Sequence, residues 1–133
     1  MTIANNGTIF VSIADADKPR ALPLIRRFYE LGFNIEATGG TATFLRENGI
    51  RTRMLKKLSE GSTEIFESIR KGHVNYVINT IDINQHSARL DGYDIRRCAV
   101  ENNVTIFTAL ETVSVLLDVL EEITLGVSTI DAE

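Results

Sequence analysis

The chain has 133 residues, of which 44% are hydrophobic and 24% are charged, and its formal net charge is −4. This length fits one domain with its own core, and the negative charge disfavours general affinity for nucleic acids and membrane surfaces, which are polyanionic. Cys98 is the only cysteine, which excludes a disulfide framework and a cysteine-based zinc site and favours a reducing cytoplasm.

The hydrophobic pattern alternates along the chain between two periods. Short segments rich in β-branched residues predict strands, and apolar residues that recur every three or four positions between them predict helices. Pro19 falls in the first turn of the first helix, and Gly32, Gly49 and Gly72 fall where helices end. The expected elements, in chain order, are a strand over 8–13, a helix over 17–31, a strand over 33–37, a helix over 41–48, a strand over 51–58, a helix over 63–71, a strand over 76–80, a helix over 93–102, a strand over 104–108 and a helix over 112–125.

Strands and helices alternate through the whole chain, which indicates the α/β class: a parallel sheet with helices on both faces and right-handed crossovers. We expect a three-layer α/β/α sandwich with five strands. One domain is expected over residues 7–125, followed by a C-terminal tail over residues 126–133 that looks frayed. No apolar run approaches the roughly 20 residues that cross a bilayer, and the N-terminus lacks the pattern of a signal peptide.

Some helical positions are expected to face the core. Cys98 falls among them, so we expect a small buried side chain rather than a reactive one. The inward positions expected in the last two helices are Ile95, Ala99, Val100, Val113, Leu116, Leu117, Leu120 and Ile123.

Polar residues gather where the predicted strands end. Ligands of open α/β sheets bind outside the carboxyl ends of the strands, so these residues are the candidates for a binding site. They are Ser12, Lys18, Thr38, Gly39, Gly40, Thr41, Lys56, Lys57, Asn79, Thr80 and Thr108.

The segment Thr38-Gly39-Gly40-Thr41 joins a strand to a helix and favours a phosphate site. Backbone N–H groups at a helix start point at an anion, and glycine lets its oxygens come close. Lys18 and Lys57 add positive charge. Simpler interpretations remain: the segment is a tight turn with Thr41 as helix N-cap, and the lysine pair 56–57 is a solvated strand end. Neither a P-loop nor a GxGxxG pattern is present.

The histidines give no metal signature. His73 is expected on the surface at the opposite edge of the sheet, and His86 in a polar loop over residues 82–87. Arg96 and Arg97 form a solvated helix face or contact another domain.

These features resemble a known family, the methylglyoxal-synthase-like domain at the C-terminus of the carbamoyl-phosphate synthase large chain. The similarity covers about residues 7–125. The segments that carry it are FVSIADADK (10–18), GFNIEATGGTATFLRENGI (32–50), KKLSEG (56–61), IRKGHVNYVINT (69–80) and YDIRRCAVENNVTIFTAL (93–110).

The resemblance implies a sheet order of 3-2-1-4-5 and an allosteric role within a glutamine-hydrolysing ligase of arginine and pyrimidine biosynthesis. Bacterial members bind nucleotide effectors, with UMP as inhibitor and IMP as activator. The phosphate turn then falls on residues 38–41, the family's lysines on Lys18 and Lys57, its serine on Ser12, and its base- or ribose-contacting pair on Asn79 and Thr80. In members that respond to ornithine, a threonine at the boundary with the synthetase core falls on Thr108, and vertebrate mitochondrial members bind N-acetylglutamate.

The resemblance further implies that the domain itself is not catalytic and needs no cofactor or metal. ATP and magnesium or manganese ions would serve the full-length synthase, whose core and glutaminase small chain would be the partners. Ile81 and Asp82 depart from enterobacterial members, which carry a further hydroxyl and a small polar loop there, so the effector stays open.

The alternative is methylglyoxal synthase, which acts on dihydroxyacetone phosphate and needs a carboxylate base. Its Gly-Gly-Asp-Gln and Asp-Pro motifs are missing, and Glu60 is the only nearby acid expected. An inosine-monophosphate cyclohydrolase domain ranks last because its additional catalytic segments are missing.

Overall fold

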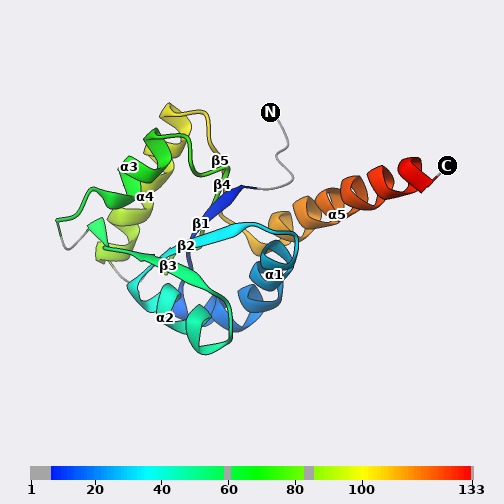
Figure 1. Ribbon diagram of the computed structural model, residues 1–133. Coiled ribbons are helices and arrows are strands. Elements are labelled where there is room, and N and C mark those ends of the chain that lie inside the picture. Colours follow the sequence, from blue (N-terminus) through cyan, green and yellow to red (C-terminus); the bar gives the residue numbers. More distant parts are fainter. Residues whose placement is uncertain (1–6, 59–60, 83–85, 133) are drawn as a thin grey trace.

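The computed structural model describes residues 7–58, 61–82 and 86–132. Within these ranges, five parallel strands form one sheet in the order β3-β2-β1-β4-β5 (Figure 1). This confirms the predicted α/β class and the strand order. The strands are β1 (Thr8–Ser12), β2 (Asn34–Thr38), β3 (Thr52–Leu55), β4 (Tyr76–Asn79) and β5 (Thr105–Phe107), and the helices are the 3-10 turn η1 (Asp15–Asp17), α1 (Lys18–Glu30), α2 (Gly39–Glu47), α3 (Glu64–Arg70), α4 (His86–Glu101) and α5 (Leu110–Ala132).

Strand β1 lies at the centre of the sheet and pairs with β2 on one side and β4 on the other. The pairing sets Ser12 opposite Asn79 and Val11 opposite Ala37. All strands run in the same direction, so the last residues of β1, β2 and β4 meet at one edge. That edge is where the candidate site residues were expected.

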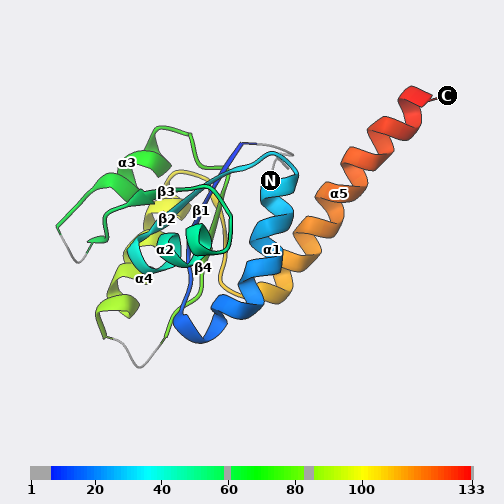
Figure 2. The same ribbon diagram turned by 60° about the horizontal axis from the view of Figure 1, so that its bottom comes forward.

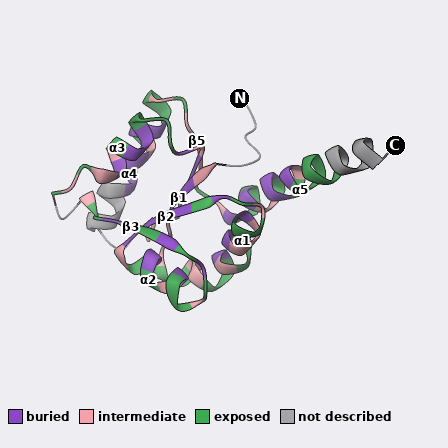
Figure 3. Ribbon diagram, in the orientation of Figure 1, coloured by how far each residue is buried: buried purple, intermediate pink, exposed green. Residues whose placement is uncertain are grey.

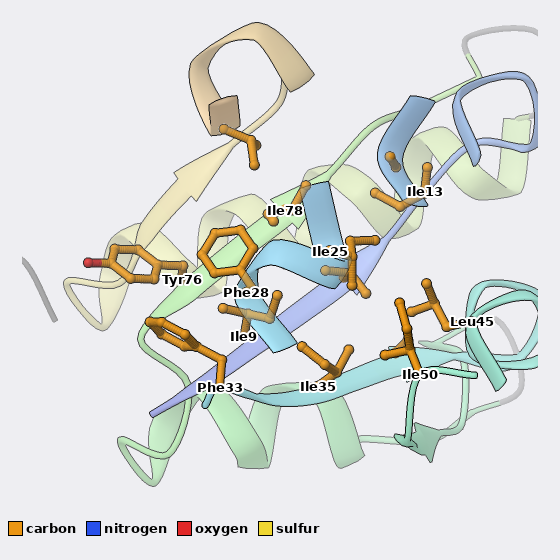
Figure 4. Packing of buried hydrophobic residues seen from close by; sticks show 14 of the residues in the cluster. Ile9, Ile13, Ile25, Phe28, Phe33, Ile35, Leu45, Ile50, Tyr76 and Ile78 are labelled. Carbon is orange, nitrogen blue, oxygen red and sulfur yellow. The ribbon is translucent and has the colours of Figure 1, made fainter. Parts of the chain in front are cut away.

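Two hydrophobic clusters hold helices on the two faces of the sheet. Helices α1, α2 and α5 pack on one face through the larger cluster, and α3 and α4 pack on the other (Figures 1 and 2). Figure 4 shows the larger cluster, in which the rings of Phe28 and Phe33 meet edge to face at 5.2 Å and Tyr76 lies against both. Burial runs through the central strands (Figure 3), as expected for a parallel sheet covered on both sides.

Several element bounds differ from expectation. Helix α2 begins at Gly39, so both glycines belong to its first turn instead of a connecting turn. Helix α4 begins at His86, so the prediction of a loop over residues 82–87 is wrong for residues 86 and 87, which are helical. Residues 83–85 lie outside the described ranges. Strand β3 is only Thr52–Leu55, and the backbone N–H of Lys56, the next residue, donates to the side chain of Glu64. The 3-10 turn η1 was not expected.

Helix α5 is longer than predicted and continues through Ala132, over most of the residues expected to be a tail. Its apolar stripe is buried from Val113 to Leu120, whereas Ile123 is 36% exposed, so the expected inward position of Ile123 is wrong. The helix leaves the body of the domain at this point (Figures 1 and 2). Val100 in α4 is also exposed, contrary to expectation, while Cys98 is buried as predicted.

Across the described residues, no helix is both long enough and apolar enough to cross a membrane.

Candidate anion-binding site

A pocket of about 290 Å³ opens at the carboxyl ends of β1, β2 and β4. Its walls come from the strand ends, from the starts of α1 and α2, and from the segment after β3. Most of the residues predicted for the site meet here, although they come from separate parts of the sequence. Those that line the pocket are Ser12, Lys18, Thr38, Gly40, Thr41, Lys57, Asn79 and Thr80.

Three predicted residues are not among the described residues that line this pocket: Gly39, Lys56 and Thr108. Gly39 lies beside it in the first turn of α2. Lys56 is exposed, and its backbone N–H donates to Glu64 Oε2 at 2.9 Å. Thr108 is exposed after β5, at the edge strand. The lysine pair is thus divided, with only Lys57 at the pocket.

Two lysine side chains approach the start of α2. A Cβ atom built on Gly40 would lie 3.7 Å from Lys18 Nζ, and one built on Gly39 would lie 3.9 Å from Lys57 Cε. The glycines therefore leave the helix start open where the lysines approach. Backbone N–H groups of the first turn have no acceptor within the helix, and the helix end carries partial positive charge. Two cations and these donors together suit a phosphate.

The threonine hydroxyls mainly hold the backbone after β1. Thr41 Oγ1 accepts a hydrogen bond from Ile13 N–H at 3.1 Å, and Thr80 Oγ1 accepts one from Ala14 N–H at 2.9 Å. Thr41 is therefore not the N-cap of α2; Thr38 occupies that position, without a side-chain capping bond. These bonds fix the segment that leads from β1 to Lys18 and so shape the pocket.

Asn79 supplies a donor that no residue in the described chain satisfies. Its side chain is buried, with 2% of the residue exposed, and Nδ2 has no hydrogen-bond partner there. A buried amide without a partner loses the free energy of its hydration, typically about 1–3 kcal/mol. An acceptor on a bound ligand would restore that bond.

Gly92 is a site residue that sequence reasoning missed. A Cβ atom there would lie 2.9 Å from Asn79 Nδ2 and 2.7 Å from Ile81 Cδ1, so α4 comes so close to the end of β4 that any larger residue would push these side chains aside. The available signal was a glycine within a run of helix-forming residues. The apolar part of the pocket wall was also missed and consists of Ile13, Leu58, Ile65 and Ile95.

The pocket carries acids as well as lysines. Asp15 forms an ion pair with Lys18. The hydrogen bond from Lys18 is the main cause that holds the pKa of Asp15 below its usual value, and the charges of Lys18 and Lys57 act in the same direction. Asp82 also lines the pocket. The expectation that Glu60 is the only nearby acid is therefore wrong, and Glu60 itself lies outside the described residues.

The model of the MGS-like domain family matches residues 20–108, which is more than half of the chain. The chain belongs to the MGS-like domain family. Among solved structures, it is similar to methylglyoxal synthase from Elizabethkingia anophelis NUHP1, with a TM-score of 0.69 and 18% sequence identity. The alignment covers 86% of this chain and 79% of that one. At this identity the likeness shows a shared MGS-like fold.

A second pocket lies at the opposite, amino edge of the sheet. It is about 380 Å³ in volume and is lined in part by Arg51, Arg53 and His73, so His73 lies at the edge where it was expected and is exposed. Arg53 pairs with the buried Glu36, which also accepts a hydrogen bond from Ser68 Oγ. Across the described residues, no group of three or more His, Cys, Asp or Glu side chains could hold a metal ion.

Proposed function

We propose that this MGS-like domain is the allosteric domain of a carbamoyl-phosphate synthase large chain and binds a nucleotide monophosphate effector. The observation that carries the proposal is that Lys18 and Lys57 both line the pocket and approach the two glycines at the start of α2. The segments quoted for the family, which include all the residues of this arrangement, support the link to the synthase.

The pocket offers a second region for the rest of a nucleotide. The unpartnered amide of Asn79 lies beside Gly92, and apolar side chains from α3 and α4, Ile65 and Ile95, complete the wall. A phosphate at the lysines would leave a ribose or base facing this region, where a carbonyl or ring acceptor meets the amide donor. UMP and IMP are the effectors proposed first, because both carry such acceptors.

In this proposal the domain has no chemistry and no cofactor of its own. The synthetase core and the glutaminase small chain are its partners in a cytoplasmic ligase that uses ATP with magnesium or manganese. Effector binding changes the activity of the distant core through a coupling free energy, typically about 1–3 kcal/mol.

Methylglyoxal synthase remains the second candidate because Asp15 and Asp82 bring carboxylates to the pocket. Asp15 is a weak candidate for the base, since its ion pair with Lys18 lowers its pKa and a base of lower pKa removes protons less effectively. We expect no methylglyoxal from dihydroxyacetone phosphate in a colorimetric assay. Turnover in that assay would reject the regulatory proposal.

The binding test compares two adjacent lysines. We expect calorimetry to show UMP or IMP binding, and Lys57→Ala to weaken it about tenfold or more, because a hydrogen bond to a charged group contributes roughly 1.5–3 kcal/mol. Lys56→Ala removes the same charge next to the pocket and is expected to change affinity much less. Gly40→Val should also weaken binding, since its side chain would fill the space below Lys18.

Three results would contradict the proposal: no binding of either nucleotide, equal effects of the two lysine variants, or unchanged binding in both Lys57→Ala and Gly40→Val. N-acetylglutamate and ornithine are titrated in parallel. If one of them binds while UMP and IMP do not, that ligand is the effector and the nucleotide proposal is rejected.

A further inference from the structure

We propose that Asp15 is a built-in competitor of the ligand: its carboxylate pairs with Lys18, and a phosphate must displace it to bind. The inference rests on the anion binding proposed for the same pocket and names the residue that limits its affinity. Asp15 would thereby set the concentration of ligand to which the domain responds.

The geometry places the carboxylate and the phosphate position on one ammonium group. Asp15 lies in η1, three residues before Lys18, and the two side chains form an ion pair at the pocket. The ammonium of that same lysine lies over the first turn of α2, 3.7 Å from the Cβ position of Gly40. An anion at the start of α2 would therefore contact a lysine that already has a partner.

The two partners differ in their freedom to move. The side chain of Lys18 is 14% exposed, whereas that of Asp15 is 85% exposed. Lys18 therefore stays at the pocket, while Asp15 can rotate into water with little loss of packing. A phosphate near Lys18 would repel the neighbouring carboxylate, because like charges a few ångströms apart interact unfavourably. Phosphate binding then replaces one anionic partner of Lys18 with another. The gain in binding free energy is therefore smaller than it would be for a lysine without a partner.

Asp17 provides a matched control. It lies two residues from Asp15 and has the same charge, but it pairs with Arg20, at 4.0 Å. Asp17 is also not among the described residues that line the pocket. Asp15→Asn and Asp17→Asn change the net charge equally and keep the size of the side chain. Only the first removes the competitor of Lys18.

The experiment titrates wild type and both variants with inorganic phosphate and with UMP, by calorimetry at pH 8 and 0.15 M ionic strength. Asp15→Asn is expected to bind phosphate about twofold to fivefold more tightly than wild type, the range expected for loss of one exposed ion pair. Asp17→Asn is expected to change phosphate affinity by less than about 1.5-fold, since it does not remove the partner of Lys18. Both aspartates are exposed or half-buried at the start of a helix, and circular dichroism verifies that the variants fold.

The two ligands separate this inference from the proposed function. Tighter phosphate binding by Asp15→Asn with no UMP binding would support the competitor and reject the nucleotide effector. Equal gains in both variants would mean a general charge effect and would overturn the competitor. Unchanged or weaker binding by Asp15→Asn would overturn it as well. No phosphate binding by any variant would also overturn the competitor, and the UMP titration would then decide the proposed function by itself.

Discussion

Individual residues of the pocket differ in how far the sequence predicts them. Lys18, Gly40 and Lys57 follow from a simple rule, because parallel strands end at one edge and a glycine-rich helix start attracts anions. The contacts of Asp15 and Gly92 were not predicted. Both depend on three-dimensional geometry. The pairing of Asp15 can be recognised only when the direction of its side chain in η1 is known, and the role of Gly92 only when the distance between α4 and the end of β4 is known.

Gly92 gives a prediction at this scale. Gly92→Ala improves helix propensity by about 1 kcal/mol, but its Cβ would collide with Asn79 and Ile81. Because the buried amide of Asn79 and the end of the Ile81 side chain have to move, we expect a net loss of roughly 1–2 kcal/mol in the free energy of unfolding, within the range for overpacking. Urea unfolding measures the change, and nucleotide titration should show weaker binding. A variant more stable than wild type would mean that the contact relaxes without cost.

Helices α1 and α5 are joined on the surface by Arg27. Its guanidinium contacts Asp118 at 2.9 Å and Glu121 at 2.5 Å, while the buried side of α5 packs on the same cluster as α1. The hydrogen bond from Arg27 lowers the pKa of Glu121. Exposed ion pairs typically contribute about 0.2–1 kcal/mol. The ion pairs of Arg27 therefore make a small contribution to the stability of α5, in addition to that of its hydrophobic packing.

The contribution of Arg27 should depend on pH. Arg27→Met keeps an apolar stem and is expected to lower the free energy of unfolding by about 0.5–1 kcal/mol at pH 7. The pKa of Glu121 is lower in the folded protein than its ordinary value of 4.5, so this stability is present above pH 4.5 and lost as the pH falls through the lowered value. Denaturant unfolding at pH 7 and pH 3 measures both differences. The same loss at both pH values would show that the effect does not come from the ion pair with Glu121.

The types and order of the main elements were predictable from the period of their apolar residues, but several of their ends were not. Helix α4 begins at His86, in a segment whose polar residues resembled a loop. The stripe of α5 was expected to stay inward through Ile123, yet its burial ends at Leu120, and the helix continues away from the body of the domain (Figures 1 and 2). Periodicity shows which face of a helix is apolar, but the length of that face that is covered depends on the neighbouring layer.

At the scale of the whole molecule, the pocket exists only in the folded chain. It combines residues from the ends of three neighbouring strands and the starts of two helices, so a ligand binds the native state and not the unfolded chain. UMP at one hundred times its dissociation constant should add about 2.7 kcal/mol of stability, which corresponds to roughly 10 °C in melting temperature for a domain of this size.

A thermal-shift titration with UMP measures this effect, and Lys57→Ala should need a higher nucleotide concentration for the same rise. A melting temperature that does not respond to saturating nucleotide would contradict specific binding. Lys56→Ala is the control and should follow wild type.

The hydrogen bonds behind the pocket join distant parts of the sequence: Thr41 to Ile13 across 28 residues, and Thr80 to Ala14 across 66. The pocket is therefore complete only when all these segments are in place. On the ribosome, a nascent chain would have β1, β2 and the first turn of α2 available well before Thr80 is synthesised. A metabolite could therefore stabilise the emerging protein only after β4 has joined the sheet, and it would have little effect on the earlier steps of its synthesis.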